Sequence, residues 1–244
     1  MPIELDFQGK CALVTGGTKG IGRAIATRFL EAGANVVVCG RGEPSDLPEA
    51  SGRRAAFVAA DVRDAEQVDR MVAFAVATFG GLDVLVNNAG GSPSSDAATA
   101  SPRLVEKVIA LNLTAPFLCA QRANAVMQGQ VGGGAIVNVA SVSGTRPSPG
   151  TAAYGAAKAG LLNLTQTLGV EWAPKVRVNA VTCGLVQTEL SHLYYGDAAG
   201  VARVAATVPM GRLGLPVDVA DACLFLASPL ASYVTGAALA LHGG

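Results

Sequence analysis

The chain has 244 residues, half of them hydrophobic, and its 18 Lys and Arg residues balance its 18 Asp and Glu residues. A chain of this length and composition is able to bury a large core, and its neutral charge balance gives no basic field to attract nucleic acid or an anionic membrane. We therefore expect one domain, residues 1–244, that acts on a small molecule and has neither nucleic acid nor membrane as a partner.

The N-terminal residues contain no charged leader followed by a long apolar core, and no later apolar run reads as a membrane span. The five cysteines form no CxxC pair, and their odd number suits a reducing compartment in which most of them serve as small buried hydrophobes. We expect a cytoplasmic protein. Because His192 and His242 lack the spacing of metal ligands, no metal site is predicted.

Short apolar runs alternate with longer helical ones along the whole chain. In the first half, CALVTGG, NVVVCG, AAFVAAD and LDVLVNNAG read as strands, and residues 21–32 and 65–79 read as helices. In the second half, predicted helices over 103–127, 152–172 and 217–227 lead into the strands GAIVNVAS, VRVNAVTCG and AALALHGG. The strands are continuously apolar, as in sheets buried on both faces. This order predicts an α/β fold: a single-domain, Rossmann-type, doubly wound parallel sheet of about seven strands with helices on both faces.

The least regular stretch, residues 184–214, follows a predicted strand and is interpreted as a substrate-binding lid within the domain. Its apolar side chains favour an apolar or partly apolar carbonyl substrate, although they would equally serve to pack on the sheet or on another subunit. These side chains are Leu190, Leu193, Tyr194, Tyr195, Val208 and Met210. Residues 91–101 are a second candidate for substrate contact.

The sequence TGGTKGIG places Gly16, Gly20 and Gly22 between a buried strand and an amphipathic helix. Glycines allow a tight turn and a close approach of the backbone, and the helix that follows offers its free N–H groups to a pyrophosphate. The turn therefore indicates a dinucleotide site, with a purely structural turn as the alternative.

Tyr154 and Lys158 stand four residues apart in an alanine-rich predicted helix, so their side chains share one face. A free phenol has a pKa near 10, and a neighbouring ammonium favours its ionised form. The pair is therefore a candidate proton donor and acceptor. The alternative is a core tyrosine next to a solvated lysine.

These motifs, in this order, resemble those of the short-chain dehydrogenase/reductase (SDR) superfamily over essentially the full length of the chain. NNAG at residues 87–90 and the thirteen-residue step from Ser141 to Tyr154 belong to the match. The resemblance implies a catalytic tetrad of Asn112, Ser141, Tyr154 and Lys158. It also implies cofactor contacts at Gly16, Thr18, Lys19, Gly20, Ile21, Gly22, Arg41, Asp61, Val62, Asn88, Ala89, Gly90, Tyr154, Lys158, Val186 and Thr188.

The implied chemistry is hydride transfer between a nicotinamide cofactor and a ketone or secondary alcohol. Tyr154 would act as general acid in reduction and as general base in oxidation, and Ser141 would bind the same substrate oxygen. Pro116, four residues after Asn112, should bend the predicted helix there and free the Asn112 carbonyl. The resemblance then implies a proton relay from Tyr154 through the cofactor ribose and Lys158 to a water on Asn112, whereas Asn112 alternatively only caps a broken helix.

The cofactor is predicted to be NADP(H), with NAD(H) as the alternative. An acidic residue about twenty positions beyond the glycine turn would bind a ribose 2′-hydroxyl, but the predicted second strand ends in Cys39-Gly40-Arg41. Arg41, helped by Lys19, would instead bind a 2′-phosphate. The alternative for Arg41 is a solvated turn residue.

Two positions depart from the family's pattern. Cys183 stands where the family usually has proline, which would leave the turn under the nicotinamide less rigid, and His242 stands where it usually has aspartate. A histidine so far along the chain from the tetrad is expected to be structural.

The substrate remains open between 3-oxoacyl thioesters, the first choice, and steroids, terpenoids or other ring alcohols. The sequence shows no convincing anion-binding cluster, although Arg146 and Arg203 are cations that could meet a phosphate or carboxylate on the substrate. A non-catalytic dinucleotide-binding protein is the rival from another class, and the complete tetrad argues against it. The resemblance also implies a homo-oligomer, a tetramer or dimer, formed through the helices that carry Asn112 and Tyr154.

Overall fold

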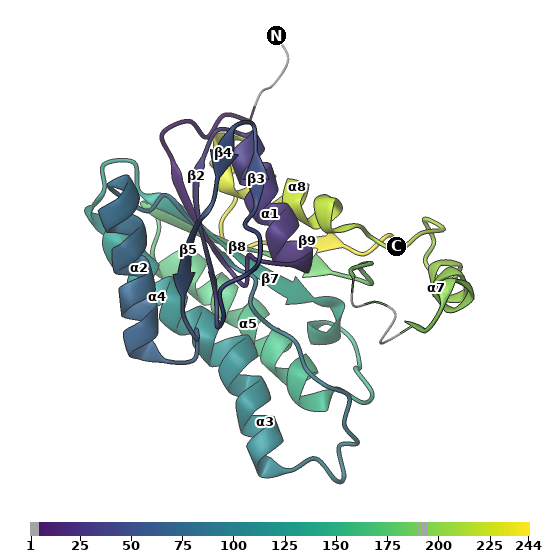
Figure 1. Cartoon of the computed structure of the whole chain (residues 1–244). Coiled ribbons are helices and arrows are strands. Elements are labelled where there is room, and N and C mark those ends of the chain that lie inside the picture. Colours follow the sequence, from purple (N-terminus) through teal and green to yellow (C-terminus); the bar gives the residue numbers. More distant parts are fainter. Residues whose placement is uncertain (1–4, 190, 192–194) are drawn as a thin grey trace.

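A seven-stranded parallel sheet forms the centre of the computed structural model, which describes residues 5–189, 191 and 195–244 (Figure 1). The strand order is β5-β2-β1-β6-β7-β8-β9, so the chain reverses its direction of travel across the sheet between β1 and β6. The strands are β1 Cys11–Thr15, β2 Asn35–Gly40, β5 Ala56–Ala59, β6 Val84–Asn87, β7 Gly134–Ser141, β8 Val176–Cys183 and β9 Ala238–Leu241. A small antiparallel pair, β3 (Glu49–Ala50) and β4 (Arg53–Arg54), follows β2.

Helices cover both faces of the sheet (Figure 1). The helices are α1 Gly20–Glu31, α2 Ala65–Phe79, α3 Pro102–Ile109, α4 Ala115–Gly129, α5 Ala152–Glu171, α7 Ala198–Ala205 and α8 Pro216–Ala227. On one face α1 packs against α8, and on the other α2, α4 and α5 lie against the sheet. Successive β1 residues serve opposite faces: Ala12 and Val14 join the core under α1 and α8, whereas Cys11 and Leu13 join the other core. The predicted doubly wound parallel sheet is therefore confirmed.

Most predicted elements match the structure within one or two residues at their ends, because turn and capping residues separate them sharply. For example, Asp64 caps α2 by accepting hydrogen bonds from the backbone N–H groups of Glu66 and Gln67, and Gly80 ends the helix with a φ of 81°. The segment 184–214, predicted as irregular, contains the helix α7. Of its predicted apolar residues, Leu190, Leu193 and Tyr194 lie outside the described residues, as does His192.

The helix predicted over residues 103–127 is distorted at the expected place. Between α3 and α4 it passes through a π-helical turn, Ala110–Thr114, in which the N–H of Ala115 donates to the carbonyl of Ala110. The turn is wider than an α-helical turn, so the helix accommodates Pro116 by inserting a π-bulge. Asn112, completely buried, lies in the middle of this turn.

The stretch Pro102–Gly129 corrects one sequence expectation. It is long and apolar enough to cross a membrane by length and composition alone, although the sequence suggested no such run. The same criteria are met by core helices, and here Cys119, Ala123 and Met127 pack into the core beneath the sheet.

A chain of buried polar side chains ties the centre of the sheet to a helix. The Asn87 amide donates to Asn138 Oδ1 at 2.9 Å and to the Pro116 carbonyl at 3.1 Å, and Asn138 donates to Thr165 Oγ1 at 2.9 Å. Because Asn87 and Asn138 are also paired in register across β6 and β7, their contact requires that register.

Candidate active site

The carboxyl ends of β1 and β6 lie side by side where the strand order reverses, and a crevice of this kind is the usual ligand site of open α/β sheets. Thr15 and Asn88 hold the two ends together. Thr15 Oγ1 accepts hydrogen bonds from the N–H groups of Asn88 and Ala89, both at 3.0 Å, and the Asn88 amide donates to the Thr15 carbonyl at 2.8 Å. The NNAG segment is therefore fastened to the start of the glycine turn.

Glycine is required in the turn for two different reasons. Gly20, the first residue of α1, has a φ of 54°, a conformation that side chains rarely tolerate. A Cβ on Gly22 would lie 2.2 Å from the Gly16 carbonyl oxygen, so only glycine lets α1 approach the turn this closely. The side chain of Lys19, the N-cap of α1, forms no capping hydrogen bond, so the N–H groups of the first turn remain directed at the crevice.

A cleft of about 850 Å³ runs from this turn to the start of α5. It brings together nearly all the residues predicted from the sequence. Those that line it are Gly16, Thr18, Lys19, Gly20, Ile21, Gly22, Arg41, Asp61, Val62, Asn88, Ala89, Gly90, Ser141, Tyr154, Lys158 and Thr188. Two predicted residues do not line it: Asn112 lies behind its wall, and Val186 forms an isolated β-bridge with Gly214.

Ser141, Tyr154 and Lys158 meet at one end of the cleft. Ser141 is the last residue of β7, and its Oγ accepts a hydrogen bond from the N–H of Ser143 at 3.2 Å. Tyr154 lies in the first turn of α5 and Lys158 one turn later, with Lys158 Nζ 5.6 Å from the centroid of the tyrosine ring. The structure thus brings the hydroxyl, the phenol and the amine into one site.

Lys158 is buried, and its Nζ donates a hydrogen bond to the Val139 carbonyl at 2.8 Å. Loss of solvent, which disfavours the charged form, lowers the pKa of Lys158 to about 8. The nearby Cys183 opposes this shift, and burial raises the pKa of that thiol to about 12. At neutral pH the site therefore contains an ammonium group next to a neutral thiol.

Asn112 contacts the site through the backbone of Gly91. Its Oδ1 accepts from the N–H of Gly91, and its Nδ2 donates to the carbonyls of Gly91 and Val108, all at 2.9 Å. A Cβ placed on Gly90 would lie 2.8 Å from Asn112 Oδ1 and 3.4 Å from Lys158 Nζ, so both side chains border the same glycine. Asn112 thus fixes the loop after β6 and lies close to Lys158.

The other end of the cleft is rich in charge. Among the described residues, Arg41 and Lys19 form no ion pair, and both side chains are exposed on its wall. The neighbouring Asp46 is paired with Arg23, with Nη2 and Oδ2 2.6 Å apart. Because Asp46 pairs with Arg23, it is not an ion-pair partner of Arg41 or Lys19.

Asp61, predicted from the family resemblance as an adenine contact, is already bound by a cation. Arg63 Nε donates to Asp61 Oδ1 at 2.9 Å, and Arg63 Nη2 to Oδ2 at 2.5 Å. These hydrogen bonds from Arg63 lower the pKa of Asp61 to about 2. The carboxylate is thus held in one orientation and stays ionised throughout the neutral range.

The two departures from the family pattern lie at the ends of the neighbouring strands β8 and β9. Cys183 ends β8, in register with Ser141 on β7 and with Leu241 on β9, and the N–H of Gly184 donates to the Leu241 carbonyl at 2.9 Å. His242 is exposed, but its backbone crosses Gly184 so closely that a Cβ there would lie 2.6 Å from His242 Cβ. The tail therefore packs on the turn after β8.

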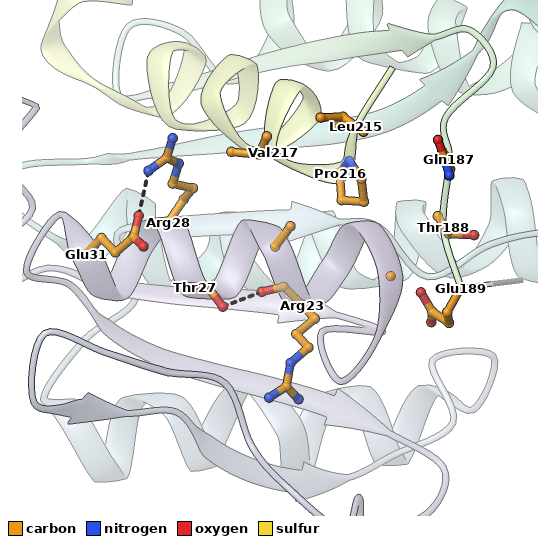
Figure 2. A pocket seen from close by; sticks show the side chains of 12 residues that line it. Arg23, Thr27, Arg28, Glu31, Gln187, Thr188, Glu189, Leu215, Pro216 and Val217 are labelled. Atoms are coloured by element: carbon orange, nitrogen blue, oxygen red, sulfur yellow. Dashed lines mark hydrogen bonds and ion pairs between the residues drawn. The ribbon is translucent and has the colours of Figure 1, made fainter. Parts of the chain in front are cut away.

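Sequence reasoning missed three charged residues on the cleft wall: Arg63, Asp46 and Glu189. The DVRD motif did place Arg63 two residues from Asp61, which is a usable signal. Glu189 gave none, because its place depends on how the chain returns after β8. It also lines a second cavity of about 710 Å³ between α1 and α8, where Figure 2 shows it below Thr188.

Comparison with known proteins gives consistent matches. The family model described as Enoyl-(Acyl carrier protein) reductase matches residues 16–244. The cis-4-hydroxycyclohexanecarboxylate dehydrogenase of Sinomonas cyclohexanicum is 41% identical over 98% of this chain and 97% of its own. The 3-oxoacyl-(acyl-carrier-protein) reductase of Chlamydia muridarum is 36% identical over 96% of both chains. A crystal structure of a putative short-chain alcohol dehydrogenase from Sinorhizobium meliloti 1021 superposes with a TM-score of 0.91, at 36% identity, over 99% of this chain and 98% of the other.

Together, the sheet, the glycine turn and the matches define an oxidoreductase that acts on alcohols or ketones with a nicotinamide cofactor, NAD(H) or NADP(H). More specifically, the chain belongs to the short-chain dehydrogenase/reductase superfamily.

Proposed function

We propose that this enzyme transfers hydride between NADP(H) and a ketone or secondary alcohol, with Tyr154 as general acid and base. The observation that carries the proposal is the single cleft lined by Ser141, Tyr154 and Lys158 at one end and by Gly16 and Gly20 at the other. The residues present fit a dinucleotide: the helix N-terminus offers N–H groups to a diphosphate, and cations lie at the far end. A bound nicotinamide would supply or accept the hydride.

The side chains divide the work on the substrate oxygen. In reduction, Tyr154 donates its hydroxyl proton to the oxygen, and in oxidation it removes that proton. The ammonium of Lys158, close to the tyrosine ring, favours the ionised phenol, and the Ser141 hydroxyl donates a hydrogen bond to the oxygen as charge develops there.

Asn112 completes the proposed set of catalytic residues. Its position beside Gly90 and Lys158 supports a role in bringing a water to Lys158 through the Asn112 backbone carbonyl. The amide side chain fixes the loop that contains Gly90 and Gly91. Asn112 would therefore position both the loop and the route by which Lys158 exchanges protons with solvent.

The choice of NADP(H) rests on the charges at the far end of the cleft. Arg41 and Lys19 are available to a ribose 2′-phosphate, whereas Asp46 is held by Arg23. An acidic side chain that would prefer the 2′-hydroxyl is absent from the end of β2, which is Cys39-Gly40.

For the substrate, 3-oxoacyl thioesters remain the first candidate, in line with the activity named for the Chlamydia muridarum relative. A ring alcohol is the second, and the higher identity to the Sinomonas dehydrogenase of a hydroxycyclohexane carboxylate favours it. We propose that residues 184–214 form the lid of a single domain, residues 1–244, and contact the substrate together with residues 91–101.

The proposal is tested by the rate of NADPH oxidation with acetoacetyl-CoA, with NADH and a no-substrate mixture as controls. Turnover by the wild type and its loss in Tyr154→Phe, with cofactor binding retained, is the expected result. Turnover with a cyclohexanone panel but not with acetoacetyl-CoA would select the second substrate class. If the wild type binds NADPH yet reduces neither class, the non-catalytic dinucleotide-binding alternative takes precedence.

A further inference from the structure

Glu189 lies where the cofactor's diphosphate is expected. A Cβ placed on Gly20 would lie 3.6 and 3.7 Å from the two carboxylate oxygens of Glu189, so both oxygens face the first residue of α1. Figure 2 shows Glu189 beside the N-terminal end of this helix, with Thr188 above it. Glu189 lines both the cofactor cleft and the cavity between α1 and α8. It therefore stands at the boundary between the two.

The position favours an anion. The first turn of α1 contains no acidic residue, and its N-cap side chain, Lys19, forms no capping hydrogen bond. The partial positive charge of the helix end is thus open to an anion that approaches Gly20 from outside the helix. The Glu189 carboxylate approaches it there.

We propose that Glu189 competes with the cofactor's diphosphate for the N-terminal end of α1 and so weakens dinucleotide binding. This inference rests on the proposed dinucleotide function. Two anions a few ångströms apart repel each other, so the carboxylate must leave Gly20 when a diphosphate arrives. Glu189 is then an affinity-setting residue, and weaker binding favours release of the used cofactor, a step that limits turnover in many enzymes.

The test compares Glu189→Gln and Glu189→Ala with the wild type by calorimetric titration. We expect both variants to bind NADPH and NADH about fivefold more tightly, because the diphosphate is common to the two cofactors. Binding of adenosine 2′-monophosphate, which has no diphosphate, should be unchanged when measured by competition. The alanine variant ensures that tighter binding does not reflect a new hydrogen bond from glutamine.

Glu31→Gln is the matched control, since it removes the same charge from the opposite end of α1. Unchanged or weaker dinucleotide binding in both Glu189 variants would overturn the inference and leave the proposed function intact. Equal tightening in Glu31→Gln, or tightening for adenosine 2′-monophosphate, would overturn it in favour of a general charge effect. A folded wild type that binds neither dinucleotide would overturn both the inference and the proposed function.

Discussion

At the scale of single residues, burial in the folded chain disfavours the charged form of Lys158. Its pKa falls from 10.5 to about 8 because the side chain is buried. Between about pH 8 and 10.5 the unfolded chain binds more protons than the folded one, so the free energy of unfolding rises with pH over this range. Below about pH 8 the lysine is protonated in both states, so the pKa shift adds no further pH dependence. Function rather than stability accounts for a lysine here.

We predict that Lys158→Met abolishes turnover. The variant should also raise the free energy of unfolding at pH 7 by about 1 to 3 kcal/mol, a gain reduced by the lost hydrogen bond to the Val139 carbonyl. Urea unfolding from pH 7 to 10 should show the advantage of the variant shrinking as the pH rises. Lys107→Met, at an exposed position on α3, is the control and should show no such trend. A pH-independent difference would contradict the assigned effect of burial.

Arg41 provides the second prediction at this scale. Arg41→Ala should weaken NADPH binding about tenfold and leave NADH binding nearly unchanged, because only NADPH carries the 2′-phosphate. Dissociation constants from calorimetry would decide this, with Arg54→Ala on β4 as an exposed control. Equal weakening of both cofactors would argue against a contact with the 2′-phosphate, and unchanged binding of both would leave Arg41 as a solvated turn residue.

At the scale of elements, the junction between β1 and α1 depends on Gly22 having no side chain. We predict that Gly22→Ala destabilises the fold by about 2 to 3 kcal/mol, because the new methyl group would lie 2.2 Å from the Gly16 oxygen and force α1 away from the turn. Chemical denaturation would measure the loss. At Gly42 no heavy atom of the described residues, its two chain neighbours aside, lies within 4 Å of an added Cβ, so Gly42→Ala should change stability little. Similar losses in the two variants would argue against the close approach.

The elements also separate what the sequence predicts from what it does not. The strand Gly134–Ser141 and the helix Ala65–Phe79 have the predicted bounds because flanking glycines and the Asp64 cap are local signals. Pro116 predicted a distortion of the helix but not its π-helical form. That form is accompanied by hydrogen bonds between Asn112 and Gly91, and contacts between residues so far apart in the sequence are not visible in local patterns.

The candidate site follows the same division. The grouping of Ser141, Tyr154 and Lys158 in one cleft was predictable from motif order, since those residues stand at the ends of recognisable elements. The position of Glu189 was not, because it depends on the three-dimensional return of the chain from β8 to α1. Local patterns reveal elements and motifs, whereas contacts across the fold require the structure.

At the scale of the whole molecule, we predict association through α4, which follows the turn with Asn112, and α5, which contains Tyr154. Phe117 on α4 is 41% exposed, and α5 presents the small residues Ala156 and Ala159 to solvent. Light scattering should give an oligomeric mass for the wild type and a lower one for Phe117→Glu. Val131→Glu, at a fully exposed turn, is the control and should keep the wild-type mass. A monomeric wild type would refute the expectation.

All five cysteines are buried as free thiols, whereas the sequence predicted burial for most of them. Burial raises the pKa of Cys11 and Cys183 to about 12 and that of Cys39 to about 11, and it shifts Cys119 and Cys223 in the same direction. Since thiolates are the reactive species, the folded chain should resist alkylating reagents at neutral pH. A single cysteine introduced at an exposed position such as Val131 would then accept a fluorescent label without removal of the native five. Because the same five thiols do not react in the folded state, the rate at which they are labelled measures how often the core opens.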